Sequence, residues 1–234
     1  MEITLEARGL TRRFGHTLAL SGCDLTLRGP GAWALVGANG AGKTTLLRLL
    51  CGALGATEGG AWVCGEEMYP ESPARRLVGF GPELGLYAHE LTAREHLTQM
   101  AALRGMSPAA AGAQEALEVC DLLPWAGRRI TALSRGTRQR LSVACALLGA
   151  PPVLLLDEPS ASLDPEQRAA LAALLRHLSG ERLVLLSTHD LALAAQVGAA
   201  RLHLEGGRLL PASPAPLAPL APLAPLAPLA PTSG

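Results

Sequence analysis

A glycine-rich segment carries the clearest chemistry in this sequence. Residues 37–45 have the sequence GANGAGKTT and match the pattern G-x-x-x-x-G-K-[ST] in full. Glycines let the backbone wrap a phosphate chain, and the N–H groups at a helix N-terminus supply partial positive charge. We therefore predict a nucleotide-phosphate site. Its residues are Gly37, Ala38, Asn39, Gly40, Ala41, Gly42, Lys43, Thr44 and Thr45.

Two residues of this segment have specific expected roles. Lys43 is the only lysine in the chain, since every other fixed positive charge is an arginine. A lysine ammonium is a compact point charge that suits the β- and γ-phosphates. The hydroxyl of Thr44 would bind Mg²⁺.

Two adjacent carboxylates follow a second apolar run. Asp157 and Glu158 come directly after Val153-Leu154-Leu155-Leu156, which predicts a buried parallel strand. The carboxyl ends of such strands form the edge where open α/β sheets bind ligands. Adjacent buried carboxylates are costly unless a cation or catalysis uses them, so we favour that role over simple surface acids.

One histidine lies in a comparable place. His189 follows the predicted strand 183–186 and should share the sheet edge with the carboxylates. A lone histidine is more often structural, but this edge also carries the phosphate loop, which favours a role in the site. The other five histidines lack such a context.

Two further segments are ambiguous from residue chemistry alone. Ser134 and Gly136, in the segment 133–141 (LSRGTRQRL), suit an ordinary N-cap of an apolar helix that runs to about Leu148. Phe14 could stack on an adenine ring as a flat apolar surface, although a core position is the more usual place for a phenylalanine.

Short strands and helices must position these residues. The glycine segment lies between a strand at 32–36 and a helix that includes 46–50. Residues 3–8 and 24–27 would join 33–36 in a first layer of strands. The remaining expected elements are strands at 61–63 and 77–80, a helix from Asp164-Pro165 to about Leu178, and a closing hairpin of 200–205 and 208–210.

The segment from about 84 to 134 predicts a helical insertion. Thr92 and Glu95 form a capping-box pattern at the start of a helix that runs to about Arg104. A second helix starts at Ser107-Pro108 and reaches about Leu123, where Pro124 would stop it.

Composition limits the class of protein. The chain has 234 residues, 49% of them hydrophobic and 17% charged, so it can bury a sizeable core. Lys plus Arg and Asp plus Glu number 20 each, which gives no basic footprint and no support for a nucleic-acid partner. The five cysteines are scattered and never spaced C-x-x-C, so we expect reduced core residues rather than a metal site or disulfides.

Two segments indicate where in the cell the protein works. The first residues show no export signal, and the apolar stretch 143–156 is broken by Gly149 and Pro151-Pro152. We expect a cytoplasmic protein. Residues 211–234 are dominated by an Ala-Pro-Leu repeat that favours polyproline II and a non-globular tail. This tail is either a repeat without a dedicated role or a spacer or docking strip for a partner.

Taken together and in order, these motifs resemble the ATP-binding cassette (ABC) ATPases over about residues 3–210. The resemblance implies an α/β P-loop NTPase fold, with a RecA-like parallel core, an N-terminal antiparallel β subdomain and the inserted helical subdomain at about 84–134. It also implies one ATP-binding domain at 1–210, followed by the tail at 211–234.

The resemblance also implies roles for individual residues. Lys43, Glu158 and His189 would be catalytic, with Glu158 polarising the attacking water and His189 holding the γ-phosphate as the switch histidine. Mg²⁺ would be held by Thr44, Asp157 and Glu83, the last standing where the family usually has its Q-loop glutamine. The remaining ATP contacts would come from Phe14 by stacking, Ser134 and Gly136 of the signature segment, and Asp164 of the D-loop Ser162-Leu163-Asp164.

Three residues depart from the family pattern. Arg135 replaces a signature glycine, Thr137 replaces its glutamine, and Glu83 adds a carboxylate near the metal. A glutamate at this last position is familiar in cassettes that resemble exporter subunits.

The resemblance implies partners as well. Each signature segment of the family closes over the ATP of a second cassette, so a homodimer or a pair with a paralogue is expected. A separate polytopic membrane subunit would dock through the region Glu83–Leu97, placing the chain at the inner face of the cell membrane. The alternatives are a nutrient importer subunit, a soluble ABC ATPase linked to nucleic acid or the ribosome, and a small-molecule P-loop kinase.

Overall fold

A six-stranded sheet forms the centre of the molecule. The computed structural model describes residues 2–83, 88, 90–161 and 163–210, and the tail 211–234 and Ser162 of the expected D-loop lie outside them. The strand order is β10-β9-β3-β8-β7-β6, with every pair parallel except β9 and β10. The strands are β3 Gly31–Val36, β6 Val78–Gly81, β7 Val153–Asp157, β8 Leu183–Thr188, β9 Ala200–Glu205 and β10 Arg208–Leu209.

A second, antiparallel sheet has the order β2-β1-β4-β5. Its strands are β1 Ile3–Phe14, β2 Thr17–Gly29, β4 Glu58–Val63 and β5 Glu66–Met68. The expectation that 3–8, 24–27 and 33–36 share one layer is therefore wrong. The reason is the turn at residues 29–31, which takes the chain from β2 into β3 of the other sheet.

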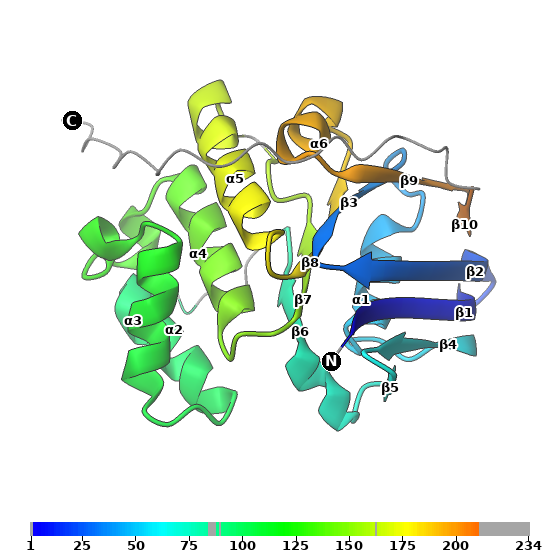
Figure 1. Cartoon of the computed structure of the whole chain (residues 1–234), viewed down its shortest axis with the longest axis horizontal. Helices are drawn as coiled ribbons and strands as arrows, with labels where there is room; N and C mark the ends of the chain where they lie inside the picture. Colours follow the sequence, from blue (N-terminus) through cyan, green and yellow to red (C-terminus); the bar gives the residue numbers. More distant parts are fainter. Residues whose placement is uncertain (1, 84–87, 89, 162, 211–234) are drawn as a thin grey trace.

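The central sheet is covered on both faces, because its middle strands β7 and β8 are buried at every position. Side chains alternate between the two faces of a strand, so Leu154, Leu156 and Leu186 pack in one core while Leu155 and Leu185 pack in another. The first core includes helices α4 Arg135–Leu147, α5 Pro165–Leu178 and α6 Leu191–Val197, and the second includes α1 Lys43–Leu50 and the antiparallel sheet. Figure 1 shows these two flanks on opposite sides of the central strands.

The helical insertion contains α2 Ala93–Leu103 and α3 Ala109–Val119. The predicted capping box is present: Thr92 Oγ1 accepts the Glu95 N–H at 3.2 Å, and Glu95 Oε2 accepts the Thr92 N–H at 2.8 Å. The second helix ends earlier than expected, at Val119 rather than near Leu123. Asp121 adopts a left-handed φ of 52°, and the Leu122 N–H returns to the Leu117 carbonyl, which terminates the helix before the proline.

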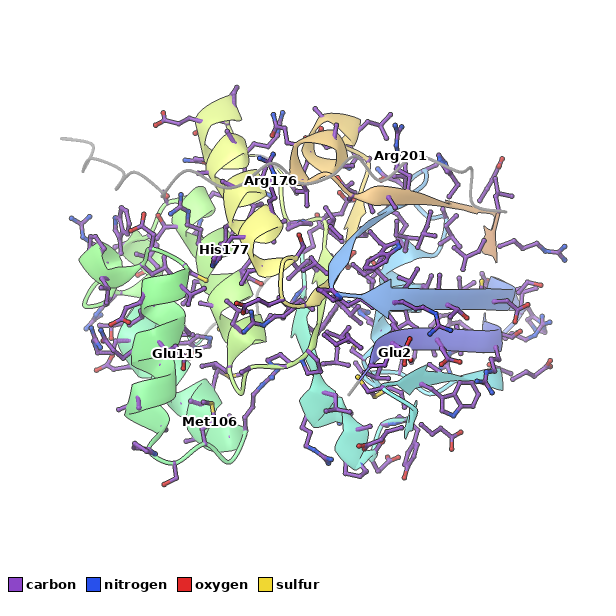
Figure 2. The ribbon with its side chains drawn as sticks, in the orientation of Figure 1. Glu2, Met106, Glu115, Arg176, His177 and Arg201 are labelled. Atoms are coloured by element: carbon purple, nitrogen blue, oxygen red, sulfur yellow. The ribbon has the colours of Figure 1, made fainter. Side chains whose placement is uncertain are left out.

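Close packing joins the turns of this insertion. A Cβ on Gly112 would lie 2.3 Å from Cε of Met106, which is labelled in Figure 2, so the α2–α3 connection rests directly on α3. Within the described residues, every helix is too short or too polar to cross a membrane.

The five cysteines are all free thiols. Cys23, Cys51 and Cys120 are buried as expected, whereas Cys64 and Cys145 are only partly buried. Burial raises the pKa of the Cys145 thiol to about 12 and also raises the pKa of Cys23 and Cys51. Thiols with raised pKa values are poor nucleophiles at neutral pH, which suits packing residues.

Candidate functional site

The glycine segment forms a loop between β3 and α1, as the sequence predicts. Gly42 caps α1 with a left-handed φ of 104°, and a Cβ there would lie 2.7 Å from the Ala19 carbonyl oxygen. Only glycine fits such a position. The loop therefore presents its backbone N–H groups at the start of a helix, the arrangement that suits phosphate.

The loop lines a cavity of about 490 Å³. Other strands contribute to the same cavity, and its lining residues are Thr17, Leu18, Ala19, Asn39, Gly40, Gly42, Lys43, Thr44, Thr45, Glu83, Glu158, Gly206 and Gly207. The contributions of β2 and of the turn between β9 and β10 escaped sequence reasoning, although Gly206-Gly207 was visible as a turn.

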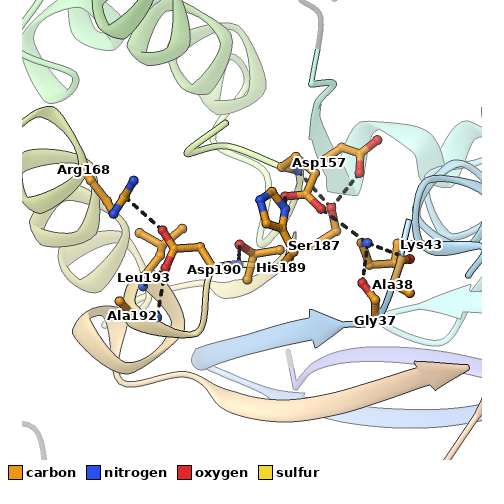
Figure 3. A network of polar contacts seen from close by, with 12 residues as sticks. Gly37, Ala38, Lys43, Asp157, Arg168, Ser187, His189, Asp190, Ala192 and Leu193 are labelled. Atoms are coloured by element: carbon orange, nitrogen blue, oxygen red, sulfur yellow. Dashed lines mark hydrogen bonds and ion pairs between the residues drawn. The ribbon is translucent and has the colours of Figure 1, made fainter. Parts of the chain in front are cut away.

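Lys43 is only 7% exposed and lies folded over its own loop. Its ammonium donates to the carbonyl oxygens of Gly37 at 2.7 Å and Ala38 at 3.2 Å, and it lies 3.4 Å from Oε1 of Glu158. The positive charge thus lines the cavity beside a carboxylate. Figure 3 shows Lys43 against Gly37 and Ala38.

The two carboxylates end β7, where the sequence places them. Asp157 is 3% exposed and Glu158 is 9% exposed. Ser187 of β8 contacts both residues: its hydroxyl donates to the carboxylate of Asp157 at Oδ1 over 2.6 Å and accepts the backbone N–H of Glu158 at 2.9 Å. Sequence analysis gave Ser187 no role.

His189 follows β8 and reaches the second carboxylate. Its Nδ1 lies 2.9 Å from Oε2 of Glu158, and its side chain remains 67% exposed. An ionised carboxylate only accepts hydrogen bonds, so Nδ1 carries the proton in this contact. Lys43, Glu158 and His189 therefore form one connected group.

Oxygen donors suited to a hard cation gather at the same place. Thr44 and Glu83 line the cavity, and Asp157 ends the neighbouring strand beside Glu158. Hydroxyl and carboxylate oxygens are the donors that Mg²⁺ prefers, so this donor set fits that ion.

The signature residues lie away from the glycine loop in the structure. Ser134 is exposed and caps α4 by accepting the Thr137 N–H at 3.2 Å. Gly136 is buried, and a Cβ there would lie 2.7 Å from the side chain of Gln167 in the same chain. Ser134, Gly136 and Asp164 line a separate cavity of about 200 Å³, apart from the glycine loop.

Phe14 lies at the end of β1 and is 46% exposed, so it is not a core residue. The guanidinium carbon of Arg12 lies 4.6 Å from its ring centroid. Thr17, its cross-strand partner, lines the cavity of the glycine loop, whereas Phe14 itself does not. The ring is thus exposed, and it lies next to the cavity of the glycine loop without lining it.

An ion pair that the sequence did not reveal lies beside the carboxyl ends of the strands. Arg168 of α5 lies 2.9 Å from Oδ2 of Asp190 and donates to the Leu163 carbonyl at 3.3 Å. Asp190 caps α6 by accepting the N–H groups of Ala192 and Leu193. Helix α6 was not predicted. Arg168 joins the turn before α5 to the residue that follows His189 (Figure 3).

A family model described as ABC transporter matches residues 20–161 of this chain. That range contains the glycine loop, the signature segment and both carboxylates of β7.

Curated relatives cover nearly the whole described chain. The Escherichia coli protein YbhF, a probable multidrug ABC transporter ATP-binding protein, is 37% identical over 91% of this chain, which spans only 38% of the length of YbhF. The Nod factor export ATP-binding protein I of Burkholderia lata is 34% identical over 87% of this chain and 68% of its own length. The nickel import ATP-binding protein NikO of Rhodobacter capsulatus is 35% identical over 92% and 91%.

Solved structures share the fold. A dimeric structure of the cassette MJ0796 matches with a TM-score of 0.78 at 23% identity, covering 88% of this chain and 96% of that one. A structure of the cassette MJ1267 in its ADP conformation matches with a TM-score of 0.77 at 22% identity, covering 90% of each chain.

Proposed function

We propose, from the premise that this chain belongs to the ABC transporter family, that it is the ATP-binding and ATP-hydrolysing subunit of a transporter. The observation that carries the proposal is the cavity of the glycine loop. The loop supplies a helix N-terminus and Lys43, and Glu83 and Glu158 line the same cavity. Phosphoryl transfer needs this combination of phosphate anchoring, water positioning and charge neutralisation.

Each residue of the cavity then has a proposed role. The loop N–H groups and Lys43 bind the β- and γ-phosphates, and Lys43 exchanges the Gly37 and Ala38 carbonyl oxygens for phosphate oxygens. Glu158 orients and polarises the attacking water, and His189 donates toward the γ-phosphate. Mg²⁺, when bound by Thr44, Asp157 and Glu83, would neutralise charge on the phosphates. Phe14 and the residues at the start of β2 border the adenine end.

The site needs a second cassette. Ser134, Gly136 and Asp164 line a cavity distinct from that of the glycine loop, so one chain does not close its signature over its own phosphates. We propose that a second copy or a paralogue supplies them. Ser134 is exposed and can meet a neighbour directly. Gly136 lies under Gln167, so that side chain must move as the two cassettes close.

The membrane partner is a separate subunit in this proposal. Residues 84–87 and 89 of the docking region Glu83–Leu97 lie outside the described residues, and its described part includes the start of α2. Next to this region, the end of α2 borders a cavity of about 790 Å³ that could extend the docking surface. Leu103, which is 75% exposed, lines this cavity together with Phe80. Its lining includes the cationic residues Arg75, Arg76 and Arg104, but Glu71 is the one acidic residue among those described.

This charge pattern favours a cytoplasmic segment that is acidic and carries an apolar anchor. Arg76→Glu should therefore weaken co-purification with the membrane subunit. Arg201→Glu, on the exposed part of β9 labelled in Figure 2, is the matched charge reversal and should not. Equal recovery with both variants would move the docking site elsewhere.

Export is the direction we favour. The Nod factor export protein I is named for export, YbhF is named a probable multidrug transporter protein, and Glu83 is the residue familiar in export-type cassettes. The match to NikO, which is named for import, spans 91% of NikO, against 68% for the Nod factor export protein I. This match favours the second candidate, a nutrient importer. Transport in inverted vesicles distinguishes the two, since an exporter moves its substrate into them on added ATP.

We propose that residues 1–210 form the catalytic domain, with the helical subdomain at about 84–134, and that the tail 211–234 is not needed for ATP hydrolysis. The deciding experiment is purification of the full chain from its own cells. Recovery with a polytopic membrane protein and ATP-dependent phosphate release would support the proposal, and would place the chain at the inner membrane face. Recovery with ribosomes or nucleic acid would favour the soluble ABC alternative, and failure to bind ATP would remove both.

A further inference from the structure

We infer that Ser187 is a positioning residue for both carboxylates at the end of β7, an inference that rests on the ATPase activity proposed above. Ser187 is completely buried in β8 and pairs in register with Asp157 of β7. Residues in register on neighbouring parallel strands direct their side chains to the same face of the sheet. The hydroxyl of Ser187 and the carboxylate of Asp157 are thus brought together by the strand pairing itself.

The directions of the two hydrogen bonds follow from donor chemistry. The backbone N–H of Glu158 can only donate, so Ser187 Oγ accepts it at 2.9 Å. The single hydroxyl proton is then directed to Asp157 Oδ1, which lies 2.6 Å away. One hydroxyl therefore satisfies a donor and an acceptor from consecutive residues, and it fixes their orientation relative to each other.

For Asp157, the consequence is a fixed carboxylate plane. The bond to Oδ1 restricts rotation of the side chain and leaves Oδ2 as the oxygen without this bond. A ligand carboxylate that is held by a hydrogen bond from a neighbouring residue binds its cation in a defined orientation. Ser187 would thus act on the cation through Asp157 without touching it.

For Glu158, the consequence is a fixed backbone. Glu158 has a left-handed φ of 43°, which is unusual for a residue with a side chain. Its N–H is held by Ser187, and its carbonyl accepts the Ala161 N–H at 3.1 Å. This conformation directs the side chain toward Lys43 and His189, so loss of the Ser187 hydroxyl should let the peptide turn and withdraw the carboxylate.

A buried hydroxyl elsewhere provides the matched control. Ser179, at the end of α5, is 3% exposed and donates to the Arg176 carbonyl at 2.8 Å. Ser179→Ala removes one buried hydrogen bond and leaves the site untouched. Any change that Ser187→Ala shows beyond this control reports the position of Ser187 rather than the loss of a hydroxyl from the interior.

The experiment compares Ser187→Ala and Ser187→Cys with Ser179→Ala and wild type in the full chain. The cysteine variant leaves no cavity and offers only a weak donor, so it decides the question should the alanine variant fail to fold. Three quantities are measured: phosphate release as a function of Mg²⁺, ATP affinity without Mg²⁺, and ATP affinity with Mg²⁺, both affinities by a fluorescent ATP analogue.

The expected result is selective. Turnover and the gain in affinity on adding Mg²⁺ should each fall by about 10–100-fold in the Ser187 variants, the usual effect of removing a residue that orients a metal ligand. Affinity without Mg²⁺ should stay near that of wild type, and Ser179→Ala should match wild type throughout.

The inference is overturned if the Ser187 variants keep wild-type turnover and Mg²⁺ response, or if they lose ATP affinity equally with and without Mg²⁺. The proposed function fails in a different way, since wild-type protein would then neither bind nor hydrolyse ATP.

Discussion

The imidazole of His189 and the carboxylate of Glu158 are held together across the ends of β8 and β7, with Nδ1 2.9 Å from Oε2. The other oxygen of Glu158 lies 3.4 Å from Nζ of Lys43. The carboxylate of Glu158 therefore bridges the imidazole of His189 and the ammonium of Lys43. In the proposed mechanism phosphate oxygens compete with it for both groups, so we expect ATP binding to release Glu158 toward water.

Replacing the bridging carboxylate should separate binding from chemistry. Glu158→Gln keeps the shape of the side chain but cannot polarise water as a base, so turnover should fall by about 10²–10⁴-fold. ATP binding should persist, and the unhydrolysed nucleotide should trap a dimer. Phosphate release and size-exclusion chromatography with ATP measure both effects. Glu115→Gln on the exposed face of α3 is the control, and wild-type turnover in Glu158→Gln would remove Glu158 from this role.

Removing the only lysine should abolish nucleotide binding. Lys43→Ala deletes the ammonium that faces the cavity, and no other lysine exists to substitute for it. Binding of a fluorescent ATP analogue should become undetectable, while Arg48→Ala, at an exposed position of the same helix, should bind normally. Retained affinity in Lys43→Ala would mean that the backbone of the loop is sufficient.

The cap of α6 should contribute measurably to stability. Asp190 accepts two N–H groups of the helix and pairs with Arg168, where the two side chains are 18% and 32% exposed. Asp190→Ala should cost about 1 kcal/mol or slightly more in the free energy of unfolding, as loss of an N-cap does. Asp190→Asn should cost less, because asparagine caps nearly as well. Urea unfolding tests this order, which equal costs for the two variants would contradict.

Contact between β6 and α4 leaves no room for a side chain at Gly79. A Cβ there would lie 1.9 Å from the carbonyl oxygen of Ala146, a backbone atom that cannot rotate away. Gly79→Ala should therefore destabilise the protein by about 3 kcal/mol or more. Gly127→Ala is the matched control, since its added Cβ meets nothing within 4 Å. Similar melting temperatures for the two variants would show that β6 and α4 can move apart at little cost in stability.

Acid should weaken the helical subdomain through His96. This side chain is 3% exposed in α2, and burial lowers its pKa below the ordinary value of 6.5. The unfolded chain then binds a proton that the folded chain resists, so stability falls as the pH drops below about 6.5. His96→Asn should flatten this dependence in urea unfolding at pH 5 to 8, whereas His16→Asn in the exposed β1–β2 turn should not.

The sequence by itself determined the parts whose chemistry is local. The glycine loop, the capping box of Thr92 and Glu95, and the carboxylates after β7 depend on neighbouring residues along the chain, and the structure has each where the pattern places it. The order of the motifs also determined the family and the parallel core. Phe14 shows the limit of such reasoning, because burial is not encoded by residue type, and the ring lies exposed under Arg12 rather than in the core.

Only the tertiary structure decided which distant residues meet. The pairing of β7 with β8 places Ser187 against Asp157, and the packing of α5 beside α6 places Arg168 against Asp190. The turn between β2 and β3 places these strands in two different sheets. The signature residues line a different cavity from the one that the glycine loop lines. Strand register and helix packing are set by how many buried surfaces fit together at once, and no short stretch of sequence carries that information.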